Sequence, residues 1–121
     1  MHEIGIANSV LETVRAEANR FRGKHICRVG VQIGELAGVD PDALRFCFEA
    51  LVRGTDFEPL ALDVEYRPRR HQCSACGRSF VAPIEDLACP DCGALNSQFI
   101  GGDELEIAYL EVEDGARNAG T

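Results

Sequence analysis

The chain is poor in basic residues and in long apolar runs. Its 121 residues include 12 Lys and Arg against 20 Asp and Glu, which gives a formal net charge of −8. That balance disfavours nucleic acid and anionic membrane surfaces as partners. No apolar run approaches membrane-spanning length, and the N-terminus lacks the basic and apolar regions of a signal peptide. We therefore expect no membrane insertion and a cytoplasmic location, where the six cysteines are reduced or metal-bound.

The sequence also lacks the motifs of the common enzyme classes. It contains only three histidines, and it has no serine–histidine–acid set, no phosphate-binding loop and no HExxH motif. We therefore predict that the protein is not an enzyme.

Paired cysteines are the strongest motif that is present. Two C-x2-C pairs are separated by twelve residues, and a glycine directly follows each pair. This spacing is typical of a structural zinc site, in which four thiolates close a tetrahedral shell and leave no position for a substrate. Two disulfides or a redox C-x-x-C are the alternatives. The predicted zinc ligands are Cys73, Cys76, Cys89 and Cys92.

The hydrophobic pattern predicts an α+β fold, with two helices on one face of a small three-stranded sheet and an inserted four-cysteine, zinc-ribbon-like domain. In the last strand the apolar residues change parity, which indicates either a bulge near Ala108 or a strand that is buried on both sides. Cys27 and Cys47 fall on apolar faces, so we expect both thiols to be buried. The expected helices cover residues 6–21 and 41–52, and the expected strands cover 26–33, 60–67 and 104–113.

This pattern divides the chain into two domains. Residues 1–70 together with 101–113 form the α/β domain, and residues 71–100 form the zinc domain. The polar tail, residues 114–121, is predicted to be disordered.

The N-terminal triplet Met1-His2-Glu3 offers a second metal site. The terminal amine of Met1, the backbone nitrogen of His2 and the His2 imidazole can close two fused chelate rings, a chemistry favoured by Ni(II) and Cu(II). These donors fill three corners of a square plane and leave the fourth exchangeable. The alternative is that His2 is a frayed terminal residue. Asp40, which precedes Pro41 as a helix N-cap, is the acidic residue expected nearby.

A short basic segment leads into the cysteine motif. The segment contains Arg67, Arg69 and Arg70, followed by His71. His71 lies two residues before Cys73, the first cysteine of the motif, and could replace a thiolate on zinc. Such a flank could contact nucleic acid, or it could balance acidic neighbours, which the net charge favours.

Four segments, taken together, resemble the HypA/HybF family of hydrogenase nickel-incorporation proteins. They are Met1-His2-Glu3, Gly34-Glu35-Leu36, the Pro-Asp-Ala-Leu-Arg-Phe of residues 41–46, and the paired cysteines. The resemblance covers residues 1–112. No single segment is specific, whereas their combination in this order is. Some members carry histidines beside the knuckle cysteines, but this chain has none there.

The resemblance implies a nickel metallochaperone that helps to insert Ni2+ into the large subunit of [NiFe] hydrogenase. It implies the HypB GTPase as a partner and, in some organisms, a role with urease maturation proteins. His2 carries over as the essential nickel ligand with Glu3 beside it, Asp40 as an acidic position near the nickel end, and the four cysteines as ligands of a structural Zn2+. The rival interpretations are a zinc-ribbon module that binds nucleic acid and an adaptor that binds only protein.

Overall fold

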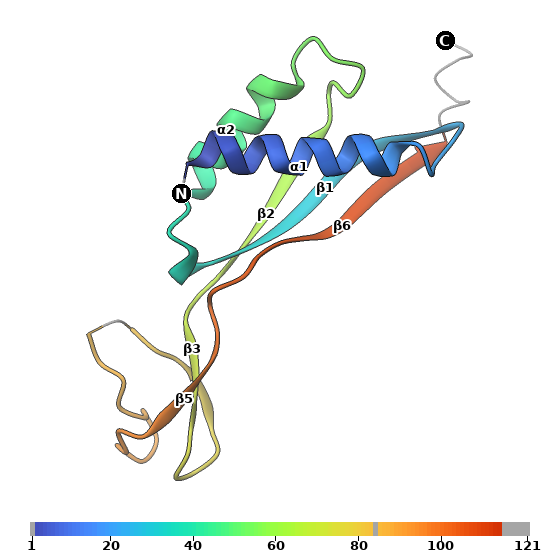
Figure 1. The fold of residues 1–121 in the computed structure, drawn as a ribbon. Coiled ribbons are helices and arrows are strands. Elements are labelled where there is room, and N and C mark those ends of the chain that lie inside the picture. The colour runs from blue at the N-terminus through green and yellow to red at the C-terminus, as the bar shows by residue number, and fades with distance from the viewer. Residues whose placement is uncertain (1, 84, 115–121) are drawn as a thin grey trace.

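The computed structural model describes residues 2–83 and 85–114. Over these residues the chain forms two long helices, one short 3-10 helix and six strands, arranged as two small sheets (Figure 1). In chain order the elements are α1 (Glu3–Ala18), β1 (Lys24–Gly34), η1 (Glu35–Ala37), α2 (Pro41–Val52), β2 (Ala61–Arg67), β3 (Arg70–Cys73), β4 (Ser79–Val81), β5 (Ser97–Gly101) and β6 (Leu105–Asp114).

The larger sheet has the strand order β2-β1-β6. β1 runs parallel to β2, to which it is connected through α2, and antiparallel to β6. Both helices lie on one face of this sheet, and the smaller sheet β4-β3-β5 extends from its end (Figure 1). The predicted α+β arrangement is therefore confirmed. The tail from residue 115 lies outside the described residues, so its predicted disorder stays a prediction.

The core forms where α1, α2 and β1 meet. Its fully buried members are aliphatic or aromatic, and they include Ala7, Val14, Val29, Ile33, Leu44 and Phe48. α1 begins at Glu3 and ends at Ala18, three residues earlier at each end than the predicted range. His2 is the N-cap, and its carbonyl accepts hydrogen bonds from the amides of Gly5 and Ile6. The first helix therefore starts directly after the second residue of the chain.

Two bulges set the register between β1 and β6. Gly30 pairs with Tyr109 and Val31 pairs with Ile107, so Ala108 is the extra residue and the predicted bulge is confirmed. The second bulge was not predicted: Ile26 pairs with Val112 and Arg28 with Glu111, which leaves Cys27 unpaired on β1.

The second bulge corrects the prediction for Cys27. Because a bulge residue shifts the alternation of side chains, Ile26 takes the buried position and Cys27 is only half-buried. Cys47 is half-buried too, packed against the edge of the core. The prediction that both thiols are buried was therefore wrong.

The two sheets are joined where the central strand β1 ends. The Glu35 carboxylate accepts the amide of Arg69 at 3.0 Å, and the Leu36 amide donates to the carbonyl of Gly102 at 2.7 Å. The Gly34 amide donates to the carbonyl of Glu104, also at 2.7 Å. These bonds tie the end of β1 to both chain segments that lead into the smaller sheet.

Glycine is required at this junction because the backbones approach too closely for a side chain. A Cβ on Gly34 would lie 2.1 Å from the carbonyl oxygen of Gly102. A Cβ on Gly102 would lie 2.6 Å from the Cα of Arg69, and Gly102 also has a positive φ of 118°. Both contacts are with backbone, which cannot move aside as a flexible side chain could.

We predict that Gly34→Ala lowers the free energy of unfolding by about 2 kcal/mol, because the added methyl group overpacks the junction. Urea denaturation of the zinc-loaded protein measures this change. Gly5→Ala is the matched control: a Cβ there would meet nothing within 4 Å, and alanine favours the helix by roughly 1 kcal/mol. Equal stabilities for the two variants would contradict the proposed crowding.

Candidate metal sites

The two cysteine pairs form matching turns. In each turn the glycine after the pair donates its amide to the carbonyl of the first cysteine, Gly77 to Cys73 and Gly93 to Cys89, both at 2.9 Å. Gly77 and Gly93 have φ values of 81° and 77°, a conformation that favours glycine. The glycine after each pair therefore closes its turn.

The four sulfurs converge on one point. All lie within 4.8 Å of one another, with Cys73 Sγ 3.6 Å from Cys92 Sγ and Cys76 Sγ 3.7 Å from Cys89 Sγ. Sulfurs placed about 2.3 Å from a tetrahedral zinc are about 3.8 Å apart. The cluster therefore fits Zn2+, with no position left for a substrate. None of the six cysteines forms a disulfide.

The backbone around the cluster favours one thiolate more than the others. The amides of Cys76 and Ala75 both point at Cys73 Sγ, at 3.4 Å, and they lower the pKa of that thiol to about 7. The amide of Ala94 acts to lower the pKa of Cys92, but the contacts of Cys92 with Cys73 and the other sulfurs, together with partial desolvation, outweigh it and raise the pKa of Cys92 to about 12. Because four crowded thiols resist losing all their protons, full ionisation needs a cation.

His71 lies in β3 and belongs to the small core beside the cluster. It is 6% exposed, and its ring lies between Phe80 and Phe99. Arg69 Nε donates to Nε2 at 3.0 Å, and Ser97 Oγ lies 2.9 Å from Nδ1. Burial and then Arg69 lower the pKa of His71, which favours the neutral ring. Both ring nitrogens are therefore occupied by side chains, and the sulfur cluster is complete without the imidazole.

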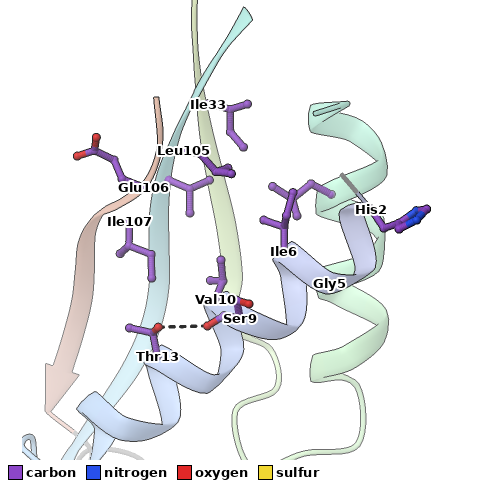
Figure 2. Close-up of a pocket in the computed structure, with 12 residues that line it drawn as sticks. His2, Gly5, Ile6, Ser9, Val10, Thr13, Ile33, Leu105, Glu106 and Ile107 are labelled. Atoms are coloured by element: carbon purple, nitrogen blue, oxygen red, sulfur yellow. Dashed lines mark hydrogen bonds between the residues drawn. The ribbon is translucent and has the colours of Figure 1, made fainter. Parts of the chain in front are cut away.

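At the other end of the chain, His2 is exposed and precedes α1 (Figure 2). Its backbone is extended, with φ −91° and ψ 130°, and its side chain makes no capping hydrogen bond. The imidazole is therefore free to turn toward a metal. Met1 lies outside the described residues, so the structure does not test the predicted amine ligand.

Glu3 and Asp40 are brought together as predicted. Glu3 Oε2 accepts the backbone amide of Asp40 at 3.0 Å, and this bond is the main reason that the pKa of Glu3 is lowered. Asp40 is the N-cap of α2: its Oδ1 accepts the amides of Asp42 at 3.0 Å and Ala43 at 3.4 Å. The beginnings of both helices therefore meet beside His2.

A groove that sequence reasoning did not identify opens beside His2. It has a volume of about 520 Å³ and is bounded by α1 on one side and by β6 on the other (Figure 2). Its lining is mostly apolar and includes Ile6, Val10, Leu105 and Ile107. The sequence does show two small residues on one face of α1, Gly5 and Ser9, both of which line the groove. Small residues on a helix face do not by themselves indicate a groove, and here the groove exists only because β6 lies opposite them.

A small α+β domain with an inserted tetrathiolate cluster defines a class of protein: a small protein stabilised by a structural zinc site. Comparison with known families places the chain within that class. Residues 1–112 match the model of the HypA family, described as hydrogenase/urease nickel incorporation metallochaperones, and the chain belongs to this family.

Individual relatives agree with the family match. A protein of Geobacter metallireducens named hydrogenase maturation factor HypA is 41% identical over 113 residues, covering 93% of this chain and all of the relative. A Chlorobium limicola protein of the same name is 38% identical over 115 residues, covering 95% of this chain and 99% of its own length. The prediction of this family is confirmed.

Two solved structures share the fold. A solution structure of a HypA protein matches with a TM-score of 0.66 and 24% identity, covering 94% of this chain and 98% of its own. The solution structure of the Ni metallochaperone HypA from Helicobacter pylori matches with a TM-score of 0.56 and 24% identity, covering 92% and 97%. Within the described residues, neither long helix has the length and apolarity needed to cross a membrane.

We predict one tightly bound zinc ion per chain, and a loss of that zinc in Cys73→Ala. Zinc in such sites contributes folding free energy on the order of 10 kcal/mol, so the variant should lose the β4-β3-β5 sheet while β2-β1-β6 remains. Elemental analysis and amide NMR spectra measure the two effects. Cys47→Ala is the control, since Cys47 lies outside the cluster. Stoichiometric zinc in Cys73→Ala would contradict the assignment.

A second prediction concerns Cys27, whose thiol donates to the carbonyl of Glu111 at 3.4 Å. Burial, followed by the carboxylates of Glu113 and Glu111, raises the pKa of Cys27. Because the thiolate is the reactive form, alkylation should begin at a higher pH than for a small unstructured thiol peptide. The rate is measured against pH in zinc-loaded Cys47→Ser. A profile at or below that of the peptide would refute the shift.

Proposed function

We propose that this protein is a nickel metallochaperone that carries Ni2+ on its N-terminus and helps to insert it into the large subunit of a [NiFe] hydrogenase. Membership of the HypA family supports the role in hydrogenase maturation. The observation that carries the site assignment is the position of His2: it is exposed, extended, and lies directly before α1. The proposed role is that of a carrier and not of an enzyme.

Three nitrogens of the first two residues supply the proposed donors. They are the terminal amine of Met1, the backbone nitrogen of His2 and the His2 imidazole. The backbone nitrogen must lose its proton to bind the metal. Because His2 precedes the helix, its amide lies at the positive end of the helix dipole, which stabilises a nearby negative charge. The start of α1 at residue 3 therefore favours the deprotonated donor.

Glu3 and Asp40 have supporting roles in the proposed site. The carboxylate of Glu3 offsets the positive helix end, which would otherwise repel a cation. Since Glu3 already accepts the amide of Asp40, it reaches nickel only with its free oxygen or by exchanging that bond. Asp40 has one oxygen, Oδ1, occupied by the α2 cap, and Oδ2 is the atom left for the metal. The fourth corner of the square plane is reserved for a recipient's ligand.

Zinc has a structural role in this proposal. Cys73, Cys76, Cys89 and Cys92 hold it, and no cluster member is free for nickel. In this proposal each metal belongs to one part of the chain. Residues 1–70 with 101–113, which contain the β2-β1-β6 sheet, carry nickel, and residues 71–100 are ordered by zinc.

The proposed partners follow from the family. They are the HypB GTPase and the hydrogenase large subunit, and the family description extends the recipients to urease. The proposed location is the cytoplasm. A nucleic-acid-binding zinc ribbon is less well supported, because the arginines near the cluster are engaged locally: Arg67 pairs with Glu65 at 3.3 Å, and Arg70 donates to Ser79 at 3.3 Å. If the protein were an adaptor that binds only protein, replacing His2 would not change the amount of nickel bound per chain.

We predict that the zinc-loaded protein binds one nickel per chain and that His2→Ala abolishes this binding. Binding should release protons and weaken in acid, because the amide and the imidazole must both be deprotonated. Isothermal titration in two buffers of different ionisation enthalpy measures affinity and proton release together. His25→Ala is the matched control, since His25 lies near the start of β1 opposite Glu113, and the start of β1 lies far from the N-terminus (Figure 1).

A second experiment tests the terminal amine separately from the imidazole. Two residues added ahead of Met1 convert that amine into an amide while leaving His2 intact. We expect nickel binding to fall nearly as far as in His2→Ala. If the extended protein binds nickel as tightly as the native chain, the amine is not a ligand, and the site must be rebuilt from His2, Glu3 and Asp40.

A further inference from the structure

The edge strand β6 is incompletely covered by the helices. α1 crosses over β1, and α2 lies over β2 (Figure 1). As a result, the residues of β6 that face the helices stay partly exposed: Leu105 is 38% exposed, and Ile107, Leu110 and Val112 are half-buried. Within residues 2–83 and 85–114, no strand pairs with the outer edge of β6. A row of backbone donors and acceptors therefore borders an apolar groove.

The groove has room for side chains from a further strand. Its helix wall includes small residues, and a Cβ built on Gly5 would meet nothing within 4 Å. Ile6 and Val10 project toward Leu105 and Ile107 across the opening (Figure 2). Alternate side chains of a strand added beside β6 would enter this space.

The face of the sheet that the helices leave open is acidic along β6, in contrast to the apolar groove. β6 and the residue before it carry five acidic residues in positions 104–114 and no basic one. Arg28 pairs with Glu111 at 3.2 Å, but Glu106 is exposed and has no ion pair within the described chain. The other alternate side chains of an added strand would lie next to this carboxylate, where a basic residue is favoured.

We propose that β6 and the groove bind an extended segment of the nickel-receiving protein, in which apolar and basic residues alternate. The groove takes the apolar residues, and the acidic face takes the basic ones. His2 is among the residues that line the groove, at the start of α1, and its imidazole points away from β6 (Figure 2). A segment bound along β6 would therefore hold its protein beside the metal-binding end of α1. The identity of the partner as the nickel recipient rests on the proposed function, whereas the surface itself does not.

Charge argues against a second copy of this chain as the occupant. Pairing β6 with its own copy would place two acidic edges side by side, and like charges opposite each other destabilise a sheet. Many edge strands carry charge to prevent such pairing. Charge alone would only prevent β6 from pairing with other strands. The apolar groove beside β6 indicates in addition that this edge can bind a strand.

The test uses a ten-residue peptide of alternating lysine and valine, added to zinc-loaded, nickel-free protein. The result expected is binding that shifts and protects amides of β6 in NMR and hydrogen-exchange spectra, without a change in oligomeric state by sedimentation. The same peptide with alternate amides N-methylated should not bind, because its pairing edge is removed, and a glutamate–valine peptide should not bind either. Perturbation elsewhere, equal binding of the N-methylated peptide, or a dimer paired through β6 would overturn the proposal.

Two pairs of variants test the two faces. Gly5→Leu fills the groove with a good helix former and should weaken peptide binding at least tenfold, whereas Asn8→Leu puts the same side chain on α1 outside the groove lining and should not. Glu106→Lys should weaken binding by about fivefold, and Glu49→Lys makes the same change in charge on the exposed side of α2. Indistinguishable members within either pair would overturn the assignment of that face.

A final arm tests the link to nickel. Lysine–valine peptides extended by two cysteines at either end are mixed with nickel-loaded protein, and the rate of nickel transfer is followed by absorbance. The end that lies near His2 should receive nickel faster than the same cysteines on an N-methylated strand, because pairing raises their effective concentration. If both peptides receive nickel at the same rate while the unmethylated peptide still binds, the surface does not serve nickel delivery. That result would overturn the assignment of the partner as the nickel recipient. Absence of nickel binding at His2 would instead remove the proposed function and leave the peptide surface standing.

Discussion

The fold depends on how its central strand ends. β1 lies between β2 and β6, and where it stops at Gly34 the two outer strands continue without it. Their continuations, β3 and β5, then pair with each other. Glu35 and Leu36 fill the point of closure by binding Arg69 on one side and Gly102 on the other. Because these contacts are made by backbone and by one carboxylate, the junction fixes the direction in which the zinc-bearing sheet leaves the domain.

The same segment also positions the N-terminus. η1 leads from the junction to Asp40, and the Asp40 amide is held by Glu3. The N-terminal end of α1 is therefore tied to the sheet through a few consecutive residues and not only through the packing of α1 on the core. A terminal residue is usually frayed, but here the residue after His2 is anchored by a hydrogen bond to another helix.

The sequence was sufficient for the features that rest on local patterns. The helix pattern, the Asp40 cap and the cysteine spacing each reflect residues that are close together in the chain, and so they were predicted correctly. The parity change in β6 was interpreted either as a bulge at Ala108 or as burial on both sides, and the structure shows the bulge. The bulge at Cys27 was not predicted, because Cys27 continues the alternation of Val29, Val31 and Ile33 and so hides the change of parity at Ile26. Only pairing with β6 shows that Ile26, and not Cys27, reaches the core. The groove beside His2 was missed for a similar reason, since its walls lie about a hundred residues apart in the chain.

The paired stem of the zinc-bearing sheet has a consequence for how this chain can vary. Arg70 and Gly101 face each other across β3 and β5, so the insert leaves and rejoins the main domain through adjacent backbone positions. Two positions that are neighbours in a ladder can be connected by a tight turn as readily as by about thirty residues. The main sheet therefore does not depend on the length of the chain beyond this pair of residues, and the zinc unit can be enlarged, shortened or exchanged while α1 and its anchors keep their places.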